Sequence, residues 1–229
     1  IICVSEYPWH DALRKSLVRS KIMILRNGVD VGIFRRKPKK RDRLRRAMNI
    51  SDDVVVCMYF GRMAASHGPL LVARSIPYVN RETSKVLFLF VGGGDEKERV
   101  INYVNSLRLS NVLFLSEMPS KDILPIADVL IDNVSRLYDG YGITILEAMA
   151  SGIPVITGRD SIKERVFTEG KEVIFCRKDD PEDIAQKILP LVFDSKKRKE
   201  LSINGRSRVV SDHSVERHME LLERILASV

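Results

Sequence analysis

The stretch that decides the fold is DGYGITILEAMASGIPV, residues 139–155. Its first two glycines indicate a loop, and the apolar residues between Ile143 and Ala150 recur at the spacing of a helix face. Gly152 is a typical helix stop, and the apolar residues that follow it read as a strand. The stretch therefore predicts a loop, a helix and a buried strand in immediate succession, which is part of a strand–helix–strand unit.

The same alternation extends in both directions along the chain. The apolar runs are continuous, as parallel strands covered on both faces require, and lie at residues 1–4, 21–25, 54–60, 86–91, 112–115, 129–131, 153–157 and 173–175. Helical patterns lie at residues 9–18, 69–76, 96–107, 144–150, 181–193 and 214–227. Gly68-Pro69 and Asp180-Pro181 are helix-start signals for two of them. This order predicts an α/β fold with a Rossmann-like, doubly wound parallel sheet.

Composition excludes several classes of protein. Of the 229 residues, 45% are hydrophobic and 30% charged, which is ordinary for a globular chain and unlike disordered or fibrous ones. No run approaches the about 18 apolar residues that a membrane-spanning helix needs. Cys3, Cys57 and Cys176 are odd in number and far apart, so neither a zinc motif nor a disulfide framework is expected. This cysteine usage favours a reducing compartment and hence a cytoplasmic location.

Positive charge is concentrated in one segment. The formal net charge is +8, and nine of the twelve residues from 35 to 46 are Lys or Arg. Such a run can meet nucleic acid, anionic lipid or only water. It contains no aromatic residue for base stacking, which argues against a nucleic-acid partner. An anionic membrane surface, at the cytoplasmic leaflet, and a solvated helix face stay open as alternatives.

The chain divides near its basic segment. Residues 1–26 read as the last strand–helix–strand of one domain, and residues 27–53 as a linker with a basic helix. Residues 54–210 read as a complete second domain, and residues 211–229 as a final helix. The chain opens on IICVS, in the middle of a strand and without an initiator Met, so we expect it to be a fragment of a longer protein.

Candidate binding residues follow the strands, because ligands of open α/β sheets bind beyond the carboxyl ends of the strands. Gly61 and Arg62, with His67 shortly after them, offer close backbone approach and cations suited to phosphate oxygens. Gly92, Gly93 and Gly94 can present amides to an anion, although glycines at such turns often serve packing alone. Their spacing departs from GxGxxG, which argues against a nicotinamide cofactor. The backbone around Met118 could meet a heterocycle.

A second group lies at the start of the helix in the opening stretch. Gly142 with the amides of Ile143 and Thr144 would form a helix N-terminus, which is a natural seat for a diphosphate. The Glu147 carboxylate, one turn further, can accept hydrogen bonds from vicinal hydroxyls. Alternatively, Glu147 only stabilises the helix dipole and Asp139 is only a turn former.

Taken in order, these motifs resemble the C-terminal, donor-binding domain of the retaining GT-B glycosyltransferases, a family that includes glycogen synthases and mannosyltransferases of lipid and polysaccharide assembly. The shared elements are Asn27-Gly28-Val29-Asp30, Gly61-Arg62, Gly92-Gly93-Gly94, and Glu147-Ala148-Met149-Ala150-Ser151-Gly152-Ile153-Pro154-Val155, with Asp179–Ala185 downstream. The resemblance covers essentially the whole chain.

The resemblance implies a role for each matching residue. Arg62 would bind the donor diphosphate, and Glu147 would hold the nucleotide ribose. The backbone around Met118 would contact the base, and Gly142, Ile143 and Thr144 would face the diphosphate and the transferred sugar. Gly61, Gly92 and Gly93 would complete the substrate-binding set.

Two positions depart from the family pattern. The first glutamate of the family, which contacts the donor sugar, is Asp139 here, shorter by one methylene. The lysine that binds the diphosphate is His67, a cation that depends on pH. Both changes bear on donor affinity and on the choice of sugar. Arg62 and Asp139 are the expected catalytic residues.

The expected function is therefore transfer of a hexose from a nucleotide diphosphate sugar to a glycan or lipid-linked acceptor. The acceptor would bind an N-terminal domain of which residues 1–26 are the tail, so the chain alone would bind donor without turnover. No cofactor is expected beyond the donor substrate, and His10, His67, His213 and His218 show no metal-ligand spacing. The alternatives are a non-catalytic nucleotide-sugar-binding module and, less favoured, a basic nucleic-acid-binding domain.

Overall fold

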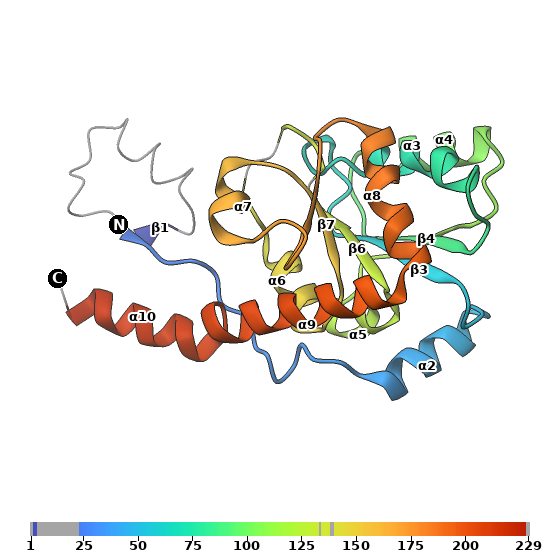
Figure 1. Cartoon of the computed structure of the whole chain (residues 1–229). Helices are drawn as coiled ribbons and strands as arrows, with labels where there is room; N and C mark the ends of the chain where they lie inside the picture. Colours follow the sequence, from blue (N-terminus) through green and yellow to red (C-terminus); the bar gives the residue numbers. More distant parts are fainter. Residues whose placement is uncertain (1, 4–22, 133, 138–139, 228–229) are drawn as a thin grey trace.

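The computed structural model describes residues 2–3, 23–132, 134–137 and 140–227 (Figure 1). Its centre is a six-stranded sheet in which every neighbouring pair of strands is parallel, in the order β5-β4-β3-β6-β7-β8. The strands are β3 (Val55–Phe60), β4 (Val86–Val91), β5 (Val112–Leu115), β6 (Val129–Asp132), β7 (Val155–Gly158) and β8 (Ile174–Cys176). Counted from β3, this is the doubly wound order 3-2-1-4-5-6, so the predicted Rossmann-like fold is confirmed.

Continuous apolar sequence explains the central strands. β4 pairs with β3 from Val55↔Val86 to Phe60↔Val91, and nearly every residue of both strands is buried. Helices cover both faces of the sheet, and each face therefore needs apolar side chains at successive positions.

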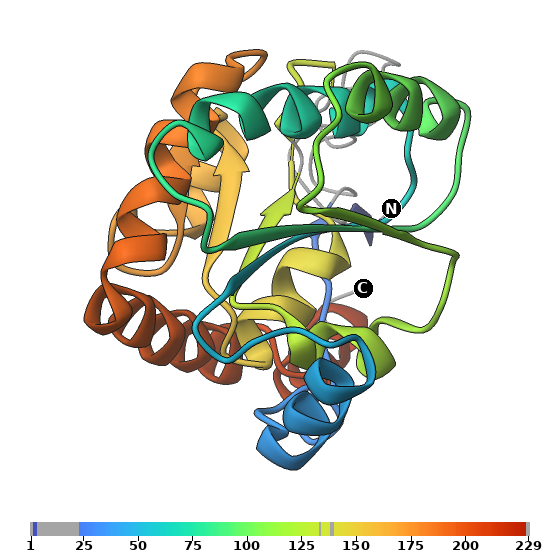
Figure 2. The same ribbon diagram turned by 90° about the vertical axis from the view of Figure 1, so that its right-hand side faces the viewer.

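Two helical layers enclose the sheet (Figures 1 and 2). One core cluster joins the sheet to α3 (Pro69–Asn80), α4 (Lys97–Ser106) and α8 (Pro181–Phe193). The other joins it to the turn α5 (Ser120–Ile123) with the 3₁₀ turn η3 (Leu124–Ile126), and to α6 (Ile143–Ala150) and α7 (Ser161–Val166). The start signals behave as predicted: Pro69 opens α3 after Gly68, and the Asp180 carboxylate accepts from the Asp183 amide at the start of α8.

Further helices complete the described part of the chain. They are α2 (Pro38–Ala47), α9 (Ser195–Asp212) and α10 (Val215–Ala227), with the 3₁₀ turn η2 (Ala65–His67). Of these, α9 contributes Leu201 and Val209 to the two clusters. α2 lies below the sheet, beside the start of β6 (Figure 2). The helical pattern missed α9, because its first half is highly charged and its buried positions include Ser202 and Gly205 beside Leu201 and Val209. The predicted helix at 9–18 falls outside the described residues.

A short parallel pair, β1 (Ile2–Cys3) and β2 (Met23–Ile24), precedes the large sheet. The chain then meets the junction of α9 and α10. The Val29 amide donates to the His213 carbonyl at 2.8 Å, and the Val215 amide donates to the Val29 carbonyl at 3.1 Å. Val29 thus ties the segment that leads into the large sheet to the junction of the two helices that follow it.

Candidate functional site

The order of the strands reverses between β3 and β6, and ligands of doubly wound sheets bind at that point, beyond the carboxyl ends. A cavity of about 330 Å³ opens on the β3 side of that point, lined by the turns after β3, β4 and β5. The structure brings together in its wall five of the predicted residues, which are Gly61, Arg62, Gly92, Gly93 and Met118.

Backbone hydrogen bonds hold these turns against one another. The Gly61 amide donates to the Val91 carbonyl at 3.0 Å, and the Met63 amide donates to the Gly93 carbonyl at 2.7 Å. Gly92 has φ +138°, and a Cβ placed on it would lie 2.0 Å from the Gly61 carbonyl oxygen. Only glycine fits this approach, so the first strand-end turn and the second form one rigid floor.

Two basic residues, Arg62 and His67, follow β3 beside this floor. The backbone of Arg62 is pinned because the Tyr59 hydroxyl donates to its carbonyl at 2.7 Å, while its side chain is exposed. His67 ends η2, half-buried, with Nδ1 3.1 Å from the Ser66 hydroxyl. Partial burial and the nearby charge of Arg62 lower the pKa of His67, which favours the neutral ring in the free protein.

The N-terminus of α6 is open. Gly142 is its N-cap and has no side chain to accept from the first amides, and no acidic residue lies in the first turn. Ile143 is exposed and Thr144 half-buried, so the amides of the first turn and the positive end of the helix dipole are available to an anion.

Glu147 connects α6 to the turn that carries Met118. Burial raises the pKa of the Glu147 carboxyl, and a hydrogen bond with Ser120 opposes that shift. Ser120 begins α5, two residues after Met118. A carboxylate accepts at about four lone-pair positions, so Glu147 keeps capacity for further donors beside the Ser120 hydroxyl.

Asp139 lies outside the described residues, and carboxylates bind the described residues Gly140 and Arg136 on either side of it. The Gly140 amide donates to Asp160 Oδ2 at 3.3 Å, at the start of α7. On the other side, Asp179 accepts from the Arg136 amide at 3.0 Å and forms an ion pair with its guanidinium at 2.7 Å. The sequence did not predict that Asp160 and Asp179 bind Gly140 and Arg136, because an Asp before a helical stretch indicates only a helix cap.

Buried charges lie beneath this loop. Lys163 is fully buried, with Nζ 2.9 Å from Asp160 Oδ2 and 2.7 Å from the Gly158 carbonyl. Lys178 also reaches Asp160, at 3.3 Å. Burial raises the pKa of Asp132, at the end of β6, to about 7, against the attraction of Lys163. The carboxyl edge of β6 and β7 thus rests on a paired, largely water-excluded charge cluster.

Glu117 is a site residue that the sequence pattern did not indicate. It lines the cavity beside Met118, and a Cβ on Gly93 would lie 2.8 Å from its Oε1. A single carboxylate in a turn after a strand has no sequence signature, so only the fold reveals its place. In the described part of the chain no three His, Cys, Asp or Glu side chains gather as a metal site requires. None of the described helices is long and apolar enough to span a membrane.

Solved structures confirm the architecture. The structure of Anabaena HepE in complex with UDP and glucose superposes with a TM-score of 0.89 at 16% sequence identity, covering 100% of this chain and 62% of that one. The six-stranded parallel sheet with its flanking helices is therefore that of GT-B glycosyltransferases.

Relatives in sequence cover most of the chain. Spore coat protein SA of Bacillus subtilis is 25% identical over 97% of this chain and 63% of its own length. A GDP-mannose-dependent phosphatidylinositol monomannoside mannosyltransferase of Mycolicibacterium smegmatis is 26% identical over 78% of this chain and 49% of its own. The chain thus spans between about half and two thirds of these relatives. Residues 40–208, which carry all the strands of the large sheet, match the model of the glycosyl transferases group 1, and the chain belongs to that family.

Proposed function

We propose that this chain is the donor-binding part of a retaining glycosyltransferase that transfers a hexose from a nucleotide diphosphate sugar to a glycan or lipid-linked acceptor. The observation that carries the proposal is the convergence of Arg62, the glycine floor and the open N-terminus of α6 at one edge of the sheet, in a member of this family. Anabaena HepE, which shares the fold, was solved with UDP-glucose.

On this proposal each residue binds a different part of the donor molecule. Arg62, the amides of Ile143 and Thr144, and His67 when protonated would stabilise the charge that grows on the diphosphate as the bond from its oxygen to the sugar carbon breaks. The sugar carbon would then bond to the acceptor hydroxyl oxygen, whose proton would pass to an oxygen of the departing diphosphate. Glu147 would hold the ribose, and the backbone at Met118 would contact the base.

Asp139 would contact the transferred sugar, where its negative charge opposes the positive charge developing on the reacting carbon. Its role is carried by the family resemblance alone.

Residues 1–26 are proposed as the tail of an acceptor-binding domain, residues 27–53 as the linker, residues 54–210 as the donor domain and residues 211–229 as the returning helix. The chain covers 49–63% of the length of the relatives compared above, which agrees with this division. On this proposal the 229-residue chain binds donor but does not turn it over.

We also propose a cytoplasmic location, with an anionic membrane surface as a partner and no nucleic acid. The three cysteines are free and buried, which fits a reducing compartment. Part of the basic run serves the fold, since Lys40 and Arg41 form ion pairs with Asp122 and Asp128 at 2.6 and 2.7 Å.

The experiment is a titration of the chain with UDP, GDP and ADP, followed by Arg62→Ala. Removing one charged hydrogen-bond donor should weaken the preferred nucleoside diphosphate by about 1.5–3 kcal/mol and leave the bare nucleoside unaffected. Arg81→Ala, an exposed arginine beyond the end of α3, is the control. Equal losses for diphosphate and nucleoside, or no binding of any nucleotide, would refute the donor site.

In the complete enzyme, Asp139→Asn should lower turnover far more than it lowers nucleotide affinity, because its charge acts on the reacting sugar. Asp139→Glu, which restores the family residue, should keep or raise turnover. Nucleotide binding without any turnover in the unmodified enzyme would identify a non-catalytic nucleotide-sugar-binding module instead.

A further inference from the structure

A second cavity lies at the opposite edge of the sheet from the donor site. Its volume is about 420 Å³, within the range of small-molecule sites. The residues that precede β6 and β7 form part of its wall, and the beginnings of α2 and α9 form the rest. Six cationic side chains line it: Arg35, Arg36, Lys37, Arg41, Arg198 and Lys199.

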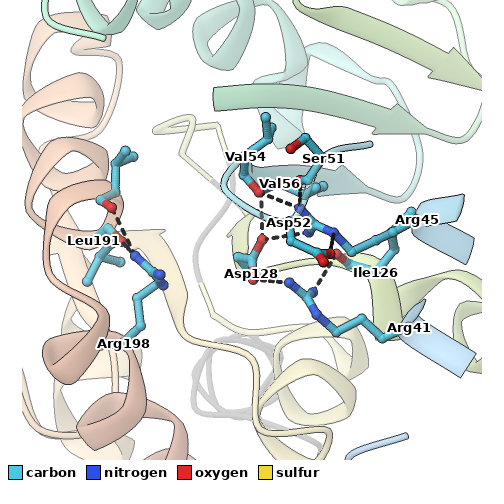
Figure 3. A network of polar contacts seen from close by, with 11 residues as sticks. Arg41, Arg45, Ser51, Asp52, Val54, Val56, Ile126, Asp128, Leu191 and Arg198 are labelled. Carbon is cyan, nitrogen blue, oxygen red and sulfur yellow. Dashed lines mark hydrogen bonds and ion pairs between the residues drawn. The ribbon is translucent and has the colours of Figure 1, made fainter. Parts of the chain in front are cut away.

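The cavity holds one acidic side chain, Asp128, and that carboxylate is already engaged. It accepts from Arg41 at 2.7 Å, from Arg45 at 3.3 Å and from the Val56 amide at 2.8 Å (Figure 3). The five other cations form no ion pair with any described residue. The cavity therefore keeps a strong uncompensated positive charge.

Two of these cations are held in place by neutral groups. Arg36 Nη2 donates to the hydroxyl of Ser202 at 2.6 Å, and Ser202 is 4% exposed. Arg198 donates to the carbonyls of Leu191 and Val192, the second at 3.0 Å, across the cavity from Arg41 (Figure 3). Neutral acceptors orient a guanidinium without cancelling its charge, so both side chains stay available to an anion.

The wall is shaped to admit Arg36. Gly152 has φ +72°, and a Cβ there would lie 2.9 Å from both Arg36 Nε and Ser202 Oγ. Pro125, Ile153 and Pro154 supply an apolar side, and Ser195 brings the first turn of the long helix α9. An oriented guanidinium and further cationic side chains therefore converge on one concave space.

We propose that this cavity is a second anion site, for a phosphate monoester or diphosphate group. Forked guanidinium donors and flexible ammonium groups around a small cavity match the several oxygens and the double charge of such a group. The ligand is a soluble phosphorylated molecule or the headgroup of a phosphate-bearing lipid. The site shares no residue with the donor cavity and does not depend on the proposed transferase function.

The test is a titration of the ¹⁵N-labelled chain with inorganic pyrophosphate, followed by amide chemical shifts. We expect saturable shifts at Gly152, Ser195 and Lys199, separable from any at Gly61 and Gly93. Arg35→Gln with Lys199→Gln should weaken binding at the first group by about tenfold or more, since each removes a charged donor. Both side chains are exposed and form no hydrogen bond or ion pair with the described residues, so the melting temperature should stay unchanged, which is the check on folding.

The matched control is Lys39→Gln with Arg43→Gln. These two residues are exposed on the same basic segment, remove the same charge and do not line the cavity. Their loss should change the affinity by less than about twofold in ordinary salt, because neither side chain lines the cavity and salt weakens the attraction between exposed charges. Equal weakening by both pairs, or no saturable shift at the cavity amides, would overturn the proposal.

Vesicles separate the two sources of the phosphate group. Sedimentation with phosphatidic acid vesicles that is competed by pyrophosphate and lost only in the Arg35/Lys199 pair would establish a lipid headgroup. Pyrophosphate binding without sedimentation would establish a soluble ligand. Sedimentation that both pairs reduce equally would show diffuse attraction to the membrane and overturn the cavity as the lipid site.

Discussion

His67 and Arg62 show how one site residue sets the chemistry of another. Partial burial and the guanidinium charge lower the pKa of the imidazole, so repulsion between two adjacent cations is reduced when the site is empty. A bound diphosphate would reverse this, because its negative charge favours the protonated ring. Binding and proton uptake at His67 should therefore be linked.

This linkage predicts a pH dependence of donor affinity. A bound diphosphate would raise the pKa of His67 above its free-state value, so affinity should be highest at low pH and fall as pH rises through both values. We expect a loss of about tenfold, the size of one charged hydrogen bond. The ligand should be a nucleotide sugar, because its diphosphate has no terminal phosphate that titrates near pH 6.

His67→Lys is the matching variant, since lysine stays charged throughout this range. Calorimetry should show a flat affinity for it and no proton uptake. A flat profile in the unmodified protein would show that His67 does not bind the diphosphate.

Gly92 carries a second prediction at this scale. Gly92→Ala should lower the free energy of unfolding by about 2 kcal/mol or more, because the new Cβ would overlap the Gly61 carbonyl and the backbone is in a region that favours glycine. Gly32→Ala, at an exposed turn, should stay within about 0.5 kcal/mol. Urea unfolding of both variants checks this, and equal effects would mean that the turns yield easily.

At the scale of elements, the charges around α7 matter more than the helix length of Ser161–Val166 suggests. Asp160 caps α7 by accepting from the amides of Ile162 and Lys163 at 3.0 and 2.9 Å. Burial disfavours its charge, yet Lys163 and Lys178 lower its pKa on balance. One carboxylate thus joins the helix start, two buried lysines and the Gly140 amide.

Asp160→Ala should therefore destabilise the protein by about 3–5 kcal/mol, the loss expected when a buried ion pair is broken. Asp194→Ala is the comparison, because Asp194 is exposed and caps α9 through the Lys197 amide alone, which is worth about 1 kcal/mol. Asp160→Asn, which keeps a cap acceptor without the charge, should fall between them. Equal losses for the two alanine variants would show that the cluster adds nothing beyond the cap.

Elements differ in how well the sequence predicts them, for physical reasons. The runs 86–91 and 112–115 coincide with β4 and β5, and 181–193 coincides with α8, because continuous apolar runs and a Pro-led cap are local signals. The sequence pattern did not predict α9, because this helix contacts the domain through small and polar residues as much as through apolar ones. Asp160 and Asp179 were not predicted as supports of the 134–142 loop, because their partners lie 20 and 43 residues away.

At the scale of the whole molecule, the aromatic contact between the Tyr141 loop and the α9–α10 junction links distant parts. His213 is 4% exposed, and its ring lies 5.9 Å from that of Tyr141 and 6.1 Å from that of Phe167. Burial lowers the pKa of His213, against a hydrogen bond to Asn27 and the charge of Asp212. The folded protein therefore favours the neutral ring.

A depressed histidine pKa makes stability depend on pH. The contribution of His213 is fully present above its unfolded pKa of about 6.5 and is lost as pH falls through the lower folded value. Between about pH 7 and pH 5 the free energy of unfolding should fall less in His213→Phe than in the unmodified protein. Identical slopes in the two proteins would assign the acid sensitivity to other groups.

The clamp at Val29 has a mechanical consequence. Val29 lies on the segment that leads into the six-stranded sheet. It is hydrogen-bonded to His213 and to Val215, on the segment by which the chain leaves that sheet. A pull applied at Arg26 and at the far end of α10 would be carried across this clamp, with the sheet lying outside the line of force. The two hydrogen bonds of Val29 would break first. While they hold, the turns after β3, β4 and β5 that line the donor cavity would stay in place.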